Sequence, residues 1–495
     1  MTAVPTPQPS KKYILKTLGC KANLYDTQLL EIELQRRGWS PATEADREED
    51  VGLCLVNSCT VTDEADKQSR KMASRLKKHH PQSKVVFTGC GAEVAPEKIA
   101  ATKGVDFVVG NQSKPDLIEM VLQAAGEPVA EGRVLGKVVD YKTLTSRHPI
   151  DREWPEPEAS FLSQDSLSQG QAVRTRAFLK IQEGCNSFCT YCIIPYGRGP
   201  SRSLPIDQLV AQVASLAEQG VQEVIFTGTN LGDYGSDWNK GGKPALEMLV
   251  SAVLERTPIR RLRVSSLDAE EVSDTLLEIM RSNERFCPHI HLSLQSSHSR
   301  ILKLMKRKYD GERVVECLRK IESIQRSAFG GPFVGMDVIT GFPGETLEEF
   351  EWGVQRLREL PWNRLHVFPY SERSGTPATR LPSAVPQTER VRRSQILLAL
   401  SLERLKETYS RALEHLKKTE DGVLTEILCE TPVQGPDTSK TWLAGYSKEY
   451  LRVVAPCPPG VSPESLQNRV IQAKVHTLWV ERASGEVSFL GEWII

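Results

Sequence analysis

The chain has 495 residues, of which 25% are charged and 39% are hydrophobic, and its formal net charge at pH 7 is zero. This is the composition of a globular protein of two to four domains, with no bulk charge that favours nucleic acid. The absence of a long apolar run or a secretory leader predicts a cytoplasmic protein without membrane contact, and its eleven cysteines then indicate metal binding in a reducing compartment.

Three cysteines near the N-terminus each follow a predicted strand. The segments before Cys20, Cys59 and Cys90 are apolar, and they alternate with helical patterns, which predicts a parallel sheet covered by helices. Ligands of such sheets bind beyond the carboxyl ends of the strands. We therefore expect the three thiols to share one metal-cluster site, whereas Cys54 lies inside an apolar run and is predicted to be a core residue.

Residues 140–172 are rich in Ser, Gln, Pro and acidic residues, which predicts a linker. A strand then leads to Cys185, Cys189 and Cys192, which are separated by three and two residues. A structural zinc site usually needs four ligands, and a disulfide would leave one thiol over. Three thiolates on one loop suit a cubane iron–sulfur cluster with one open iron, with a partial zinc site as the alternative.

The sequence around these cysteines, EGCNSFCTYCIIPYGRGPSRS, resembles the radical S-adenosylmethionine (SAM) enzymes and, more narrowly, the methylthiotransferases. The segment TLGCKANLYDTQ at 17–28 is most similar to the subgroup that modifies threonylcarbamoyladenosine (t6A) in tRNA. Ala22 departs from the usual form of that subgroup, in which valine is more common.

The resemblance implies two [4Fe-4S] clusters and SAM as cofactors. Cys185, Cys189 and Cys192 would hold the cluster that cleaves SAM to a 5′-deoxyadenosyl radical. The other three cysteines, Cys20, Cys59 and Cys90, would hold an auxiliary cluster that provides the transferred sulfur. The implied reaction is removal of hydrogen from C2 of the adenine at tRNA position 37 and its replacement by a methylthio group, giving ms2t6A. The implied partners are tRNA and an electron donor of the flavodoxin or ferredoxin type.

Segment 173–400 is predicted to be the radical SAM core, a partial barrel of about six strand–helix units whose loops form the active site. Residues at the strand ends are candidates for SAM binding, or alternatively parts of turns that bind no ligand. By resemblance these are Thr227, Gly228, Thr229, Asn230, Gly341, Phe342 and Pro343, and by their place at strand ends Ser265 and Gln295. Nearby cations are candidates for tRNA phosphate contacts, or alternatively ordinary solvated side chains: Arg198, Arg202, His291, Arg300 and the run Lys303–Lys308.

The predicted domains are an N-terminal methylthiotransferase domain at 12–139, the linker and core, a connecting basic helix at 401–419, a small antiparallel barrel at 420–483 and a tail at 484–495. The barrel resembles the RNA-binding TRAM domain. Residues 420–495 contain ten acidic and six basic residues, so RNA binding would need a local face, for which Lys448, Tyr450 and Arg452 are the candidates.

Three alternatives are compatible with this sequence. The same chemistry acts on isopentenyladenosine in tRNA in one related subgroup, and on an aspartate of a ribosomal protein in another. A noncatalytic iron–sulfur protein that binds RNA belongs to a different class. Formation of 5′-deoxyadenosine from SAM would exclude this last class.

Overall fold

The computed structural model describes residues 11–43, 46–47, 50–125, 132–136, 175–238, 245–325, 331–481 and 484–494. The predicted linker at 140–172 lies outside these residues. The described chain forms two compact units. Unit 1 contains the described residues up to 136 together with Glu183–Ser201 and Ser371–Thr376, and unit 2 contains the remainder. No helix within the described ranges has the length and apolarity that a membrane span requires.

Unit 1 is built on a six-stranded sheet with the order β2-β1-β3-β4-β5-β6, in which every neighbouring pair is parallel. The strands are β1 (Lys12–Thr17), β2 (Ser40–Pro41), β3 (Val51–Ser58), β4 (Lys84–Gly89), β5 (Phe107–Val109) and β6 (Arg133–Leu135). The central strands are apolar on both faces, as expected for a parallel sheet with helices on either side. The predicted N-terminal parallel sheet is thus confirmed.

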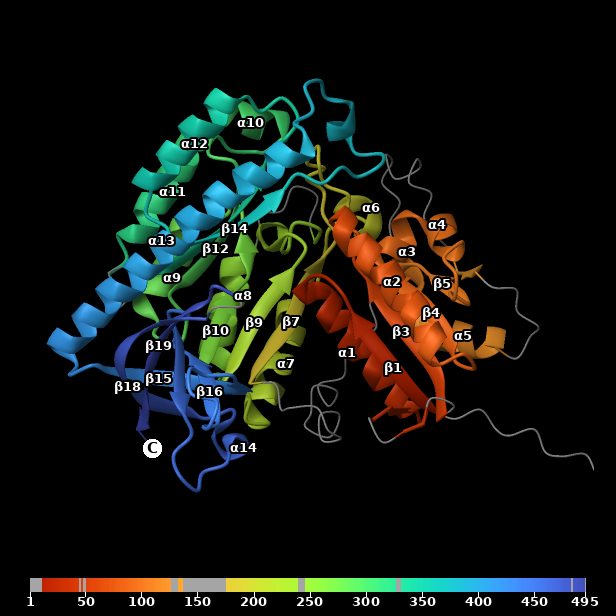
Figure 1. The fold of residues 1–495 in the computed structure, drawn as a ribbon, viewed down its shortest axis with the longest axis horizontal. Helices are drawn as coiled ribbons and strands as arrows, with labels where there is room; N and C mark the ends of the chain where they lie inside the picture. Colours follow the sequence, from red (N-terminus) through yellow and green to blue (C-terminus); the bar gives the residue numbers. More distant parts are fainter. Residues whose placement is uncertain are drawn as a thin grey trace, which may run out of the picture. The chain divides into compact units, whose positions relative to one another are not determined.

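Helices cover both faces of this sheet (Figure 1). They are α1 (Lys21–Arg36), α2 (Asp63–His79), α3 (Cys90–Val94), α4 (Pro96–Ala100) and α5 (Leu117–Ala125). One core cluster joins α1 and α5 to one face, and a second joins α2, α3 and α4 to the other. Helix α2 begins where the Thr62 hydroxyl accepts a hydrogen bond from the amide of Ala65 at 3.2 Å, which is a typical N-cap.

Unit 2 contains most of the predicted partial barrel, as two four-stranded sheets with the orders β10-β9-β7-β8 and β11-β12-β13-β14. The strands are β7 (Arg176–Glu183), β8 (Arg202–Ser203), β9 (Glu223–Gly228), β10 (Arg261–Val264), β11 (Ser266–Leu267), β12 (His289–Gln295), β13 (Phe333–Thr340) and β14 (Arg364–Pro369). Only Ser265 separates β10 from β11, so the two sheets follow one another along the chain. The alternation of strand and helix confirms the predicted α/β core.

The helices of this core lie between successive strands in the sequence. They are α7 (Ile206–Glu218), α8 (Leu246–Arg256), α9 (Asp274–Ser282), α10 (Ser299–Leu304), α11 (Gly311–Glu322), α12 (Leu347–Glu359) and α13 (Gln387–Thr419). Helix α12 starts with a capping box formed by Thr346 and Glu349. Helix α13 is continuous, so the predicted division at 400 between the core and a connecting helix falls inside one helix.

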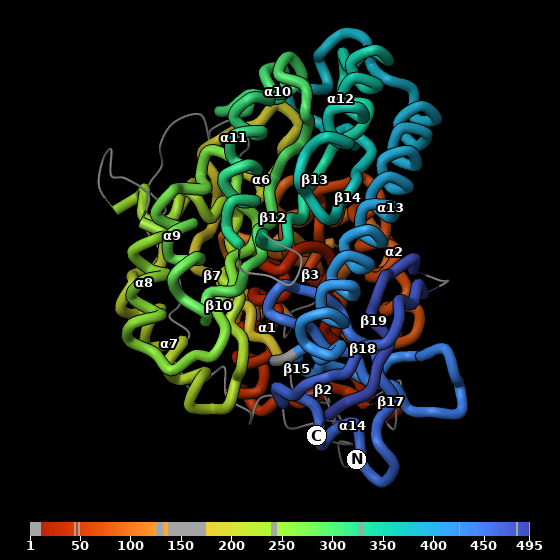
Figure 2. The backbone as a smooth tube through the Cα atoms, turned by 90° about the vertical axis from the view of Figure 1, so that its left-hand side faces the viewer, coloured from red at the N-terminus to blue at the C-terminus, as the bar shows by residue number. Residues whose placement is uncertain are grey.

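The C-terminal strands form a closed barrel with the order β15-β16-β17-β19-β18. They are β15 (Val423–Val433), β16 (Trp442–Tyr446), β17 (Arg452–Pro456), β18 (Val470–Val480) and β19 (Val487–Ile494), with α14 (Pro463–Leu466) before β18. Strand β19 pairs with both β18 and β17, so the predicted boundary at 483 is wrong: residues 487–494 close the barrel and are no tail. One core cluster joins the end of α13 to the barrel. Figure 2 shows the backbone of this helix beside the barrel strands.

Candidate functional site

Three cysteines of unit 1 stand at the carboxyl ends of adjacent strands. Cys20 is the N-cap of α1 directly after β1, Cys59 follows β3, and Cys90 begins α3 directly after β4. Cys20 is exposed, whereas Cys59 and Cys90 are buried. Burial raises the pKa of the Cys59 thiol to about 11, and repulsion from Cys90 and Cys20 adds to this effect. The structure therefore brings together three thiols, of which the first and the last are 70 residues apart in the sequence.

Two glycines shape the turns that present these thiols. Gly19 has a φ of +100°, and a Cβ there would lie 2.6 Å from the Cβ of Cys59. Gly89 has a φ of +95°, and a Cβ there would collide with the backbone of Ser58. Glycine tolerates this left-handed backbone and leaves room for the neighbouring strand. Both turns thus depend on the residue that precedes the cysteine.

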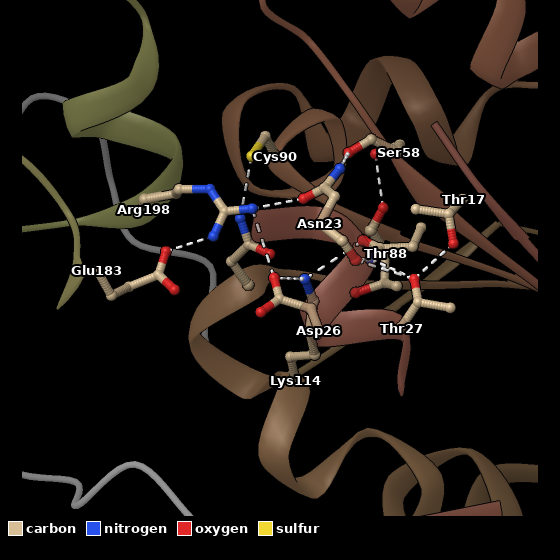
Figure 3. A network of polar contacts seen from close by, with 12 residues as sticks. Thr17, Asn23, Asp26, Thr27, Ser58, Thr88, Cys90, Lys114, Glu183 and Arg198 are labelled. Atoms are coloured by element: carbon tan, nitrogen blue, oxygen red, sulfur yellow. Dashed lines mark hydrogen bonds and ion pairs between the residues drawn. The ribbon is translucent and has the colours of Figure 1, made fainter. Parts of the chain in front are cut away.

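A buried polar network fixes the turns to one another (Figure 3). The side-chain amide of Asn23 donates to the carbonyl oxygens of Leu18 and Ser58, each at 2.8 Å. The Asn57 amide donates in return to the carbonyl oxygen of Asn23 at 2.8 Å, and the Ser58 hydroxyl donates to that of Thr88. Because these partners flank the three cysteines, the network holds the ends of β1, β3 and β4 in one arrangement.

The segment Glu183–Ser201 carries the other cysteine set and belongs to the same unit. Its turn at Gly184 has a φ of +77°, and the amide of Cys185 donates to the carbonyl oxygen of Gly199 at 3.0 Å. The amide of Ser187 lies 3.4 Å from the sulfur of Cys185, and the amide of Cys192 donates to the carbonyl oxygen of Cys189 at 3.0 Å. The loop is therefore closed on itself by its own backbone.

Both cysteine sets suit iron–sulfur clusters. No three His, Cys, Asp or Glu side chains in the described ranges are placed to hold a single metal ion. A cubane cluster makes a different demand, because each thiolate binds its own iron and the sulfurs surround the cluster. At the strand-end set, burial and the neighbouring sulfurs disfavour the thiolate form of Cys59, and binding of a cationic cluster would offset this cost.

The predicted SAM-binding residues lie at strand ends in unit 2. Thr227 and Gly228 end β9, and the amides of Thr229 and Asn230 both donate to the side-chain oxygen of Gln182, at 3.0 and 2.9 Å. Sequence analysis missed Gln182, although its place three residues before Cys185 puts it next to the end of the strand that leads to the cysteine loop. It fixes the loop that follows β9.

The remaining candidates follow the neighbouring strands. Ser265 lies between β10 and β11, and Gln295 ends β12 with a φ of +63°. Gly341 follows β13 with a φ of +69°, and its amide donates to the Glu345 carboxylate at 2.8 Å. Phe342 is fully buried and packs edge-on against another ring, so its side chain belongs to the core. SAM binding by these loops stays a prediction.

An acidic pair beyond β11 was missed by sequence analysis. Burial raises the pKa of Glu271 to about 7, and the charge of Asp268 adds to this effect. The Glu271 carboxylate accepts a hydrogen bond from the amide of Asp268 at 2.8 Å, and Arg307 forms an ion pair with Asp268. The only sequence signal for this pair is that two acidic residues follow closely after a strand.

Two of the cations proposed as phosphate contacts are engaged within the protein. Arg198 is 2% exposed and binds Glu183, Asn23 and Asp26, so its assignment to tRNA phosphate is wrong. Arg300 makes a two-pronged contact with Glu349 at 2.5 Å. Because the Arg300 side chain is 47% exposed, its contact with tRNA phosphate stays a prediction.

The candidate RNA face of the barrel is also occupied. Tyr450 lies under the guanidinium of Arg263 at 4.9 Å and against the ring of His289 at 4.8 Å, all within unit 2. Arg452 is buried and donates to Ser488 at 2.9 Å, and Lys448 pairs with a carboxylate of β15. Tyr450 therefore joins the barrel to the core, whereas Arg452 and Lys448 bind partners within the barrel. The prediction of RNA contact is wrong for the buried Arg452, and for Lys448 and Tyr450 it stays a prediction.

Comparison with known proteins identifies the class of enzyme to which this chain belongs. Residues 179–356 match the Radical SAM superfamily and residues 12–110 match the Uncharacterized protein family UPF0004. A radical SAM methyltransferase, TsrM from Kitasatospora setae, has the same fold, with a TM-score of 0.51 at 15% identity over 73% of this chain and 72% of that one. The chain is a radical SAM enzyme.

More similar relatives identify one family within this class. The chain is 35% identical to the threonylcarbamoyladenosine tRNA methylthiotransferase MtaB of Aquifex aeolicus (strain VF5) over 86% of this chain and 97% of that protein. It is 33% identical to MtaB of Bacillus subtilis (strain 168) over 88% and 89%. A tRNA-2-methylthio-N(6)-dimethylallyladenosine synthase of Carboxydothermus hydrogenoformans is 29% identical over 90% and 93%. The chain belongs to the MtaB family of radical SAM methylthiotransferases, which is a transferase family.

Proposed function

We propose that this enzyme converts t6A at position 37 of tRNA to ms2t6A. The observation that carries the proposal is the presence of two cysteine triplets in one compact unit, one on a loop and one at the edge of a parallel sheet. The names of the Aquifex and Bacillus relatives, which match over most of their length, support t6A as the substrate.

Each triplet has its own cofactor. Cys185, Cys189 and Cys192 hold the [4Fe-4S] cluster that binds SAM, and the strand-end cysteines hold the auxiliary cluster. When bound, these groups supply a radical that removes hydrogen from carbon and a sulfur that replaces it. We also propose an electron donor of the flavodoxin or ferredoxin type, and a cytoplasmic location.

The protein itself supplies shelter and orientation. Cys59 and Cys90 are buried, so the sulfurs of the auxiliary site are kept from bulk water on the side of the sheet. Exclusion of water protects a reactive radical from side reactions. Gln182 orients the loop after β9 through two amide hydrogen bonds, and Gly341 permits the sharp turn after β13. These residues shape the SAM pocket that we propose at the strand ends.

A second substrate is supported by one observation. The relative from Carboxydothermus, named for dimethylallyladenosine, is 29% identical over 93% of its length, close to the value for the t6A relatives. The two proposed substrates differ only in the group on N6 of the adenine.

Mass spectrometry of nucleosides from tRNA of cells that lack this protein separates these substrates. We expect ms2t6A to disappear and t6A to accumulate, with wild-type protein restoring ms2t6A and Cys59→Ala failing to do so. Loss of methylthio-dimethylallyladenosine instead would replace the proposed substrate. An unchanged tRNA profile would contradict both.

A second experiment tests the enzyme class. Reconstituted protein with SAM and dithionite is expected to form 5′-deoxyadenosine. Its absence, with iron bound at both sites, would contradict radical chemistry and favour a noncatalytic iron–sulfur protein.

A further inference from the structure

One buried arginine has partners beside both cysteine sets. Arg198 is the last residue of α6 (Ile194–Arg198), which begins two residues after Cys192. Its guanidinium forms an ion pair with Glu183, two residues before Cys185. It also donates to the side-chain oxygen of Asn23 at 2.5 Å and lies 3.4 Å from Asp26, both on the helix that Cys20 begins. Figure 3 shows the guanidinium between these partners.

A second contact joins the same segments. The side-chain amide of Asn111 donates to the carbonyl oxygen of Gly197 at 2.7 Å and lies 3.5 Å from the sulfur of Cys90. A Cβ on Gly197 would lie 3.4 Å from the Cβ of Cys90, so the backbone of α6 rests directly on the auxiliary site. Every atom in these contacts belongs to unit 1.

The charges of the network are balanced. Asp26 also pairs with Lys114 at 3.0 Å, so two cations face two carboxylates, all of them buried. Buried ion pairs rarely stabilise a fold more than apolar residues of the same volume would, because desolvation offsets their attraction. Their best-supported use is to specify one arrangement. The planar fork of arginine suits this role, since it fixes several acceptors in one plane.

We propose that Arg198 is a positioning residue that holds the SAM-cluster loop at a fixed separation from the auxiliary cysteines. The inference rests on the proposed function, in which hydrogen removal and sulfur transfer follow one another on the same substrate carbon. Such steps need reacting atoms about 3–3.5 Å apart, and a misplacement of 1 Å costs roughly 100-fold in rate. Without Arg198 the radical forms but meets a substrate that is out of line with the sulfur.

Three variants of the reconstituted holoenzyme test this role. The double variant Arg198→Gln with Glu183→Gln removes the fork without leaving its partner carboxylate unpaired. Arg198→Lys keeps the positive charge but loses the fork. Asn111→Ala breaks the second contact without a change of charge. The control is Arg36→Gln, on the exposed face of α1, where the side chain is 45% exposed.

Two readouts distinguish positioning from general damage. The first is the number of 5′-deoxyadenosine molecules formed per ms2t6A, which we expect to rise about tenfold or more in the double variant and in Arg198→Lys, less in Asn111→Ala, and not in the control. The second is the dipolar coupling between the two reduced clusters in pulsed EPR, which we expect to weaken and broaden. Iron content at both sites serves to confirm that each variant is folded and loaded.

The outcomes are separable from failure of the proposed function. The dipolar coupling needs no tRNA, so it reports on positioning even if the substrate proves to be another nucleoside. Unchanged coupling and an unchanged ratio in loaded Arg198→Lys and Asn111→Ala would overturn the proposal. Full recovery by lysine, with loss in the glutamine double variant, would also overturn it, because charge alone would then be the cause.

Discussion

The two cysteine sets of unit 1 are built in opposite ways. Cys185, Cys189 and Cys192 lie within eight residues, on a loop closed by its own backbone hydrogen bonds. Cys20, Cys59 and Cys90 come from three strands and meet only because β1, β3 and β4 are neighbours in the sheet. The arrangement of the first set depends on one short loop, whereas that of the second depends on the packing of distant segments. The two should therefore respond differently to the same kind of perturbation.

The largest difference is expected from removing one thiol of each set. Cys189→Ala should abolish both SAM cleavage and methylthiolation, because the open-iron cluster is lost. Cys59→Ala should keep SAM cleavage and abolish sulfur transfer. Assays of 5′-deoxyadenosine and ms2t6A on the reconstituted variants measure both. Sulfur transfer by Cys59→Ala would show that the strand-end cysteines hold no auxiliary cluster.

The second-largest difference is expected from removing Lys114, a buried cation whose partners Asp26 and Asn57 lie beside the strand-end cysteines. Lys114→Met leaves Asp26 with Arg198 as its remaining cation, and removal of one partner of a buried pair costs about 3 kcal/mol. We expect lower thermal stability and less iron at the auxiliary site, with the SAM cluster retained. Lys67→Met, in an exposed pair with Asp63, is the control and should change neither quantity. Equal loss of iron from both sites would contradict the separation.

The turn before Cys90 offers a smaller test. Gly89→Ala should destabilise the fold by about 2 kcal/mol, since a left-handed backbone is strained for alanine and the new methyl group meets the backbone of Ser58. Gly220→Ala is the matched control, with a φ of +86° and open space around it, so it isolates the backbone strain. Urea unfolding of both variants measures the difference. Equal effects would mean that the strand end yields to the methyl group.

The smallest effect is expected within the local loop. Phe188 has a φ of +47°, and its ring packs edge-on to Tyr196 at 5.6 Å. Phe188→Gly should relieve backbone strain and lose a ring contact of about 0.5–1.5 kcal/mol, leaving stability nearly unchanged. Iron at the SAM cluster should be retained, measured by iron analysis and EPR. Loss of that cluster would mean that the loop depends on side-chain packing more than its backbone indicates.

Much of this architecture could be predicted from local patterns. The apolar runs before Cys20, Cys59 and Cys90 gave the strands, and the rule that ligands bind beyond strand ends placed their thiols together. The predicted boundary at 483 was wrong because the local sequence of β19 can indicate a strand but cannot indicate its pairing with β17 and β18. Pairing is a long-range property.

The error at Arg198 has a physical cause. Arg198 stands in a basic stretch, where phosphate is a reasonable partner. It instead meets the carboxylate of Glu183, at the end of β7. Tyr450 stacks on Arg263. The charge and shape of a side chain indicate what it can bind, and the fold decides which partner it meets.

The sequence by itself determined the chemistry. Cysteine spacing on a short loop, and glycine before Cys20 and Cys90, are local choices whose geometry follows from a few backbone angles. Only the tertiary structure decided that Arg198 lies between the two cysteine sets, with partners 15 and 175 residues away. Sheet order and helix packing bring such residues together, and these arise from burial of apolar surface over the whole domain.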